Sequence, residues 1–156
     1  MTKLDALPDD FRDLLVELTD AGVEFVLIGG WAMAVHGRPR ATDDIDVLVR
    51  ATTDNAARVH AALAAFGAPL RQHQVSETTF AELGAAYRFG VKPHLAEVLT
   101  EISGVTFDEV AKDTLSAAVD GRIIHVIGRD ALLRNKRAAA RHKDLDDVEW
   151  LERFTK

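Results

Sequence analysis

The sequence of 156 residues contains no cysteine and few residues that interrupt regular structure. The absence of cysteine excludes a disulfide scaffold, a thiol nucleophile and any zinc site built on cysteine, and it agrees with a reducing cytoplasm. Glycine and proline number only 10 and 4, which excludes collagen-like and low-complexity chains. With 47% hydrophobic and 28% charged residues, the composition is typical of one globular domain, which we expect to span residues 1–156.

Long apolar runs and an excess of positive charge are missing as well. No stretch approaches the roughly 20 apolar residues that a membrane helix needs, and no apolar leader follows Met1. We therefore expect a cytoplasmic protein with no membrane partner. The net charge of −6 disfavours a uniformly basic nucleic-acid-binding protein, but it leaves room for a bound divalent cation or a local basic patch.

The hydrophobic periodicity predicts a small α/β (α+β) domain with a mixed β-sheet flanked by helices. Asp120–Gly121 separates two apolar runs and favours the type I′ turn of a β-hairpin, whereas residues 70–93 have a weak pattern. Asp144 and Asp147 suit the N-cap and third position of the last helix. The expected helices span residues 10–21, 31–36, 54–66, 107–113, 130–141 and 144–154, and the expected strands span residues 23–28, 44–49, 85–91, 95–99, 117–119 and 123–127.

Two aspartates mark the strand at residues 44–49. Asp44 and Asp46 are two residues apart, so they project from one face of the strand with Cα atoms roughly 6.5 Å apart. Two such carboxylates can bind Mg²⁺ or Mn²⁺, and without a cation they repel each other. An isolated pair of this kind is more often the solvent face of an edge strand, so it does not by itself establish a metal site.

A glycine pair lies upstream, where the strand at residues 23–28 meets a helix. Backbone amides at such a junction bind phosphate oxygens, and the missing side chains at Gly29 and Gly30 let a triphosphate approach closely. A glycine pair alone is usually an ordinary turn. The combination of a buried strand, Gly-Gly, a helix and an Asp-x-Asp strand is a much stronger signal.

This combination resembles the nucleotidyltransferase superfamily that includes DNA polymerase beta. The chain is most similar to small bacterial AbiE-type toxin-like nucleotidyltransferases and to aminoglycoside nucleotidyltransferases. The matching segments are Ile28-Gly29-Gly30, thirteen spacer residues, Asp44-Ile45-Asp46-Val47, and within them Gly29-Gly30-Trp31-Ala32, His36-Gly37 and Arg40-x-Thr42-x-Asp44-Ile45-Asp46.

The resemblance implies transfer of a nucleoside monophosphate from an NTP to an acceptor hydroxyl of RNA, protein or a small molecule, with release of pyrophosphate. It implies a toxin–antitoxin context and an antitoxin-like protein partner as well. The alternative is a catalytically silent nucleotide- or partner-binding module with the same fold. The oligomeric state is not predicted.

The resemblance also assigns residues. Asp44, Asp46 and Glu97 are expected to be catalytic and to bind Mg²⁺ or Mn²⁺, although Glu97 equally suits an ordinary exposed strand position. The expected nucleotide-binding residues are Gly29, Gly30, Arg38, Arg40 and Lys136, with the two arginines also readable as exposed loop residues.

A basic segment near the C-terminus contrasts with the acidic remainder of the chain. Its cations suit a polyanion such as RNA, or simply a solvated helix surface. They are Arg129, Arg134, Lys136, Arg137, Arg141 and Lys143.

Overall fold

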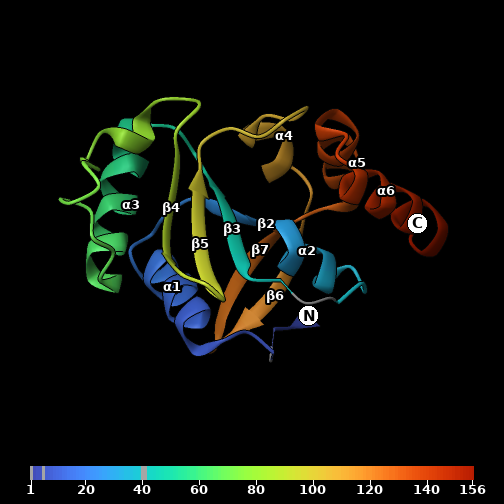
Figure 1. Cartoon of the computed structure of the whole chain (residues 1–156), viewed down its shortest axis with the longest axis horizontal. Coiled ribbons are helices and arrows are strands. Elements are labelled where there is room, and N and C mark those ends of the chain that lie inside the picture. The colour runs from blue at the N-terminus through green and yellow to red at the C-terminus, as the bar shows by residue number, and fades with distance from the viewer. Residues whose placement is uncertain (1, 5, 40–41) are drawn as a thin grey trace.

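The computed structural model describes residues 2–4, 6–39 and 42–156, which form a mixed β-sheet flanked by helices (Figure 1). The predicted fold class is confirmed. The helices are α1 (Asp9–Asp20), α2 (Gly29–Val35), α3 (Thr53–Phe66), the 3₁₀ helix η1 (Thr79–Ala81), α4 (Phe107–Ala111), α5 (Arg129–Ala139) and α6 (His142–Phe154). The strands are β1 (Thr2–Lys3), β2 (Phe25–Ile28), β3 (Asp44–Val49), β4 (Ala86–Val91), β5 (His94–Leu99), β6 (Thr114–Val119) and β7 (Arg122–Ile127).

The described strands form one sheet in the order β1-β6-β7-β2-β3-β5-β4. β2 runs antiparallel to β3, while β3 runs parallel to β5, and β4 closes one edge in the antiparallel direction. This order places the end of β2, where the glycine pair begins, next to the start of β3, where the two aspartates lie. Two segments that are separated in the sequence therefore meet in the middle of the sheet.

The two faces of the sheet differ in character. α1 packs against α3 and against β5, β6 and β7, and Figure 1 shows α1 and α3 on the side away from α5 and α6. Ile45, Val47 and Val49 are buried in the core, whereas Asp44 and Asp46 alternate with them and lie on the other face. The predicted alternation along β3 is thus present, and it keeps both aspartate side chains out of the hydrophobic core.

Local signals predict most of the elements, but β1 and η1 are not among those expected, β6 begins at Thr114 rather than at residue 117, and α2 and α6 differ at their starts. α2 begins at Gly29, two residues earlier than expected, so the glycine pair forms the first turn of the helix itself. The predicted N-cap at Asp144 is wrong, because α6 begins at His142 with Arg141 as its N-cap and Asp144 at the third position. Asp147 is not at the third position either; it is a buried ion-pair partner in the second turn.

The β6–β7 hairpin agrees with its sequence signal. Asp120 and Gly121 have φ angles of +46° and +75°, the positive values that a type I′ turn needs at both central positions. Within residues 2–4, 6–39 and 42–156, no helix combines the length and the apolar character that crossing a bilayer would require.

Candidate active site

A row of paired residues crosses four strands on the face that carries the aspartates. Arg88 of β4 pairs with Glu97 of β5, Glu97 pairs with Asp46 of β3, and Asp46 pairs with Ile28 of β2. Residues that are opposite each other on neighbouring strands project from the same face of a sheet. Asp44 lies two residues before Asp46 and shares that face. The register therefore brings the third carboxylate predicted from the sequence directly beside the aspartate pair.

These side chains line a cavity of about 610 Å³ between the sheet and α5. Most of the predicted site residues lie around it, including the glycine pair, the three carboxylates and the lysine of α5. The lining residues are Ile28, Gly29, Gly30, Thr42, Asp44, Asp46, Arg88, Glu97, Leu99, Ile102, Ser103, Leu132, Asn135, Lys136, Ala139, Arg141, Lys143 and Asp144.

Of the two predicted loop arginines, the structure describes Arg38. The Nη1 atom of Arg38 donates to Oδ1 of Asp147 at 2.8 Å and to the carbonyl oxygen of Asp146 at 3.2 Å. Its guanidinium also lies over the ring of Trp150, 5.8 Å from the centroid, and Arg38 is not among the residues that line the cavity. Arg40 lies outside the described residues. A role of either arginine in nucleotide binding stays a prediction.

The glycine pair lets the start of α2 approach the acidic strand. A Cβ atom at Gly29 would overlap Oδ2 of Asp46 and lie 3.2 Å from the Cβ atom of Asp46, and the φ angle of Gly29 is +75°. A Cβ atom at Gly30 would lie 3.2 Å from Oγ1 of Thr42. A residue without a side chain is therefore required at Gly29 both for space and for backbone conformation.

We expect Gly29→Ala to weaken both folding and activity. Left-handed backbone conformation alone costs an alanine about 1–2 kcal/mol, and displacement of the Asp46 carboxylate adds to that cost. Gly121→Ala is the matched control, since Gly121 also has φ +75° but a Cβ atom there would meet nothing within 4 Å. Urea denaturation should give a larger loss for Gly29→Ala than for Gly121→Ala. Equal losses with full activity in both variants would contradict the close approach to Asp46.

The surroundings of Asp46 raise the pKa of its carboxyl group. Burial raises the pKa of Asp46 to about 6, with further contributions from the negative charges of Glu97 and Asp44. Crowding of this kind favours a bound cation, which would neutralise the ionised side chains. The donor set consists of carboxylate oxygens only, which is the chemistry that Mg²⁺ prefers.

Within the described part of the chain, no three histidine, aspartate or glutamate side chains are grouped closely enough to hold a metal ion. The carboxylates of the site contact an arginine instead. Nη2 of Arg88 lies 3.1 Å from Oδ2 of Asp44, and its Nε lies 3.8 Å from Oε2 of Glu97. Arg88 falls in the weakly patterned middle of the sequence, and only the pairing of β4 with β5 reveals that it belongs to the site.

The opposite wall of the cavity is basic and comes from the C-terminal helices. Lys136 is buried, with Nζ 2.7 Å from Oδ2 of Asp147 and 3.7 Å from Oδ1 of Asp144. Nε of Arg141 lies 2.7 Å from Oδ2 of Asp144. Lys143 is exposed on the rim, where its positive charge acts to lower the pKa of Asp46 against the effect of burial. The cavity therefore has an acidic wall and a basic wall.

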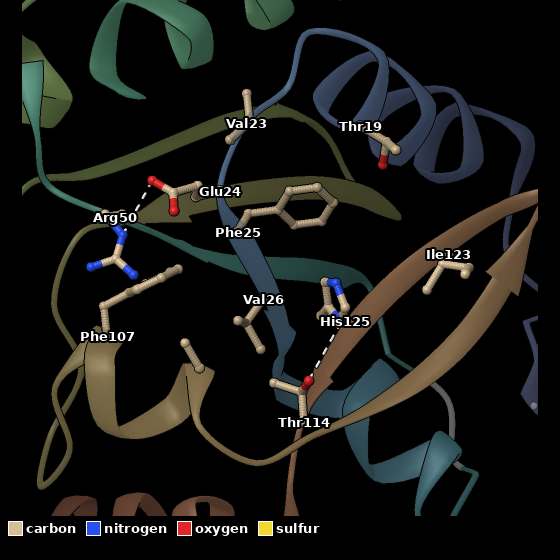
Figure 2. Close-up of a pocket in the computed structure, with 11 residues that line it drawn as sticks. Thr19, Val23, Glu24, Phe25, Val26, Arg50, Phe107, Thr114, Ile123 and His125 are labelled. Atoms are coloured by element: carbon tan, nitrogen blue, oxygen red, sulfur yellow. Dashed lines mark hydrogen bonds and ion pairs between the residues drawn. The ribbon is translucent and has the colours of Figure 1, made fainter. Parts of the chain in front are cut away.

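A second cavity, of about 400 Å³, lies between β2, α4 and β7 (Figure 2). Its polar groups already have partners: Nε of Arg50 lies 3.2 Å from Oε2 of Glu24, and Nδ1 of His125 lies 3.4 Å from Oγ1 of Thr114. Among the described residues that line it, Glu24 is the one carboxylate and there is no glycine. The larger, two-walled cavity is therefore the candidate active site.

Comparison with known proteins places this geometry in a family. The model of the family described as aminoglycoside-2''-adenylyltransferase matches residues 10–149, which include every residue that lines the two-walled cavity. Among solved structures, a proposed nucleotidyltransferase from Thermotoga maritima is similar with a TM-score of 0.59 at 15% sequence identity, covering 99% of this chain and 94% of that chain. No curated protein matches the sequence.

The structural likeness concerns the fold, whereas the family model spans most of the sequence. The predicted resemblance to the nucleotidyltransferase superfamily is thereby confirmed, while the likeness to AbiE-type toxins stays a prediction. The chain belongs to the aminoglycoside-2''-adenylyltransferase family and is a nucleotidyltransferase.

Proposed function

We propose that this enzyme transfers a nucleoside monophosphate from a metal-bound NTP to an acceptor hydroxyl and releases pyrophosphate. The observation that carries the proposal is the two-walled cavity, in which three carboxylates of the sheet face the cations of α5 and α6. A metal–triphosphate complex has the matching charge distribution, because its metal is positive and its phosphates are negative. Asp44, Asp46 and Glu97 would hold Mg²⁺ or Mn²⁺ after drawing together around the ion, because in the structure they are not grouped as a metal site and Arg88 contacts two of them.

The phosphates would be bound by groups around the rest of the cavity. Gly29 and Gly30 line the cavity, and their backbone amides would donate to phosphate oxygens. Arg141 and Lys143 supply positive charge from the opposite wall, with Lys136 behind them. The metal, when bound, contributes charge stabilisation at the entering and leaving oxygens.

The reaction is a single displacement at phosphorus. The acceptor oxygen attacks the α-phosphorus and forms a new P–O bond, while the bond from the α-phosphorus to the bridging oxygen of the β-phosphate breaks. Pyrophosphate leaves with the bonding electrons, and the hydroxyl proton passes to the carboxylate of Glu97, whose side chain is half-buried on the cavity wall. The protein accelerates this step by positioning and by charge, without a covalent intermediate.

For the acceptor, we propose a small polycationic molecule of the aminoglycoside class, with adenylate from ATP as the transferred group. The family description names both. The net charge of −6 favours a cationic acceptor over RNA.

Two arginines of the basic segment also disfavour RNA as the acceptor, because they already form ion pairs with glutamates of this chain. Nη1 of Arg134 lies 2.9 Å from Oε2 of Glu109, and Arg137 pairs with Glu152.

The decisive experiment incubates the enzyme and Mg²⁺ with each of the four labelled NTPs and with three acceptor classes: an aminoglycoside, transfer RNA and a protein mixture. Label in the aminoglycoside together with released pyrophosphate is the expected result. Label in RNA or protein would instead support the toxin-like activity. Binding of Mg²⁺–NTP without transfer to any acceptor would support the silent binding module.

A variant of the basic segment separates the acceptor classes further. We expect Arg134→Ala combined with Arg137→Ala to change KM for acceptor and for NTP by less than about twofold, since both arginines form exposed ion pairs of small energetic value. If RNA were the acceptor, log affinity would fall with log salt by roughly 0.7 per phosphate contact, and the double variant would flatten that slope by about one to two units. Steady-state kinetics at several salt concentrations distinguishes the two results.

A further inference from the structure

Arg88 lies in the acidic half of the active site, where the metal ion is proposed to bind. It projects from β4, an edge strand of the sheet, and its side chain is 54% exposed. The guanidinium extends past Glu97, its cross-strand partner, to reach Asp44 at 3.1 Å. The same arginine therefore contacts two of the three carboxylates proposed to bind the metal.

The position of Arg88 has an electrostatic consequence. Asp44, Asp46 and Glu97 crowd three acidic groups onto neighbouring positions of β3 and β5, and Arg88 is the cation that reaches two of them among the described ion pairs. A divalent metal at the carboxylates would be repelled by the guanidinium at this distance. Arg88 is able to leave, because exposed ion pairs are worth only about 0.2–1 kcal/mol and its side chain is long and flexible.

The cavity also offers a second partner for the displaced guanidinium. Arg88 lines the same cavity as Gly29 and Gly30, where the phosphates of the nucleotide are proposed to bind. Arginine forms strong, frequently bidentate hydrogen bonds with phosphate oxygens. A nucleotide therefore supplies the negative charge that compensates Arg88 for the loss of its carboxylate partners.

We propose that Arg88 is an internal counter-ion that opposes binding of the metal alone and couples metal binding to nucleotide binding. The proposal rests on the proposed metal-dependent nucleotidyl transfer. In the absence of ligands Arg88 pairs with Asp44 and Glu97, and in the loaded enzyme it pairs with the triphosphate. Because coupling between two ligands is reciprocal, the nucleotide tightens metal binding by the same factor by which the metal tightens nucleotide binding.

The test measures binding rather than turnover. Calorimetric titration with Mn²⁺, alone and with a non-hydrolysable ATP analogue, gives the metal Kd in both states for wild type and for Arg88→Gln. We expect Arg88→Gln to tighten binding of Mn²⁺ alone by about three- to tenfold, since the arginine no longer competes. The variant should also weaken binding of the analogue and reduce the coupling factor.

Arg122→Gln is the matched control. Arg122 is also a strand arginine in an ion pair, with Nη2 2.8 Å from Oδ2 of Asp20, and it does not line the cavity. Its replacement removes the same charge from the protein and should leave the metal Kd and the coupling factor at the wild-type values. Arg88→Lys, which keeps the charge without the planar fork, should give intermediate values, and thermal melting verifies that each variant is folded.

The remaining outcomes overturn the proposal. An unchanged or weaker affinity of Arg88→Gln for Mn²⁺ alone would show that the arginine does not compete with the metal. If Arg122→Gln tightened the binding of Mn²⁺ equally, the effect would come from the change in net charge and not from the position of Arg88. If Mn²⁺ binds neither wild type nor Arg88→Gln, with or without the analogue, the metal-dependent function itself fails; if it binds both equally, only the counter-ion role fails.

Discussion

Replacement of Asp46 by asparagine is expected to lower nucleotidyl transfer by at least about a hundredfold, because loss of groups that only support a metal ligand already costs about 10–100-fold. Asp46 lies at the centre of the carboxylate row, paired with Glu97 on one side and next to the glycine turn on the other. Transfer of label from ATP to the acceptor, measured at saturating Mg²⁺, gives this number directly. Activity within tenfold of wild type would contradict the assignment of Asp46 as a ligand.

The same substitution is expected to stabilise the metal-free protein at pH 8. The folded protein raises the pKa of Asp46 from 3.8 to about 6, so the ionised side chain is disfavoured in the native state, by up to about 3 kcal/mol. The penalty is fully present above pH 6. As the pH falls through about 6 toward 3.8, native Asp46 takes up a proton before the unfolded chain does, and the penalty disappears.

The prediction is therefore a difference that depends on pH. Urea denaturation in the presence of a chelator should show Asp46→Asn more stable than wild type at pH 8, with the two curves converging near pH 4. Glu77→Gln, which makes the same chemical change at an exposed position outside the cavity, should show no such convergence. A loss of stability in Asp46→Asn at pH 8 would mean that the ionised carboxylate has a structural role.

Lys136→Met is expected to destabilise the protein by about 3 kcal/mol, the lower end of the cost of breaking a buried ion pair, because the two buried carboxylates lose the lysine they share but keep Arg38 and Arg141 as partners. Lys136 lies between Asp147 and Asp144, both of them buried, and joins α5 to α6. Methionine keeps the length and apolar stem of the side chain, so the loss reports on the charge rather than on a cavity. For a chain of this size the melting temperature should fall by about 6 °C or more.

Arg137→Met is the control on the same helix. Arg137 is half exposed and pairs with Glu152 across the α5–α6 surface, so its loss should cost no more than about 1 kcal/mol. Adding Asp147→Asn to Lys136→Met should recover part of the stability, because one of the two buried carboxylates that shared the lysine then no longer carries a charge. Equal effects of Lys136→Met and Arg137→Met would show that Lys136 is not a structural ion-pair partner. In the folded variant, KM for ATP separately tests the predicted phosphate contact.

Local patterns were sufficient for the parts of the site that depend on neighbouring residues in the chain. Alternation along β3 places Asp44 and Asp46 on one face whatever the sheet around them, because successive side chains of a strand point to opposite sides. The turn at the end of β2 is likewise predictable, because glycine can adopt the positive φ angle that Gly29 has there. Both features, and the Asp120–Gly121 hairpin turn, were predictable because their causes are short-range.

The other parts of the site depend on contacts between segments that are distant in the sequence. Sequence periodicity cannot reveal which residue of β4 lies beside Glu97, since a strand register shifted by one position would move Arg88 to the other face. Asp144 and Asp147 have the spacing of helix caps, yet tertiary packing of α6 on α5 gives them the buried ammonium group of Lys136 as a partner. Asp144 still accepts a hydrogen bond from the N-cap backbone of Arg141, but burial makes an unpaired charge so costly that a cation from the neighbouring helix is needed as well. The acidic strand and the glycine turn are thus encoded locally, whereas the ion pairs of the site form only when the sheet and the α5–α6 helix pair are folded.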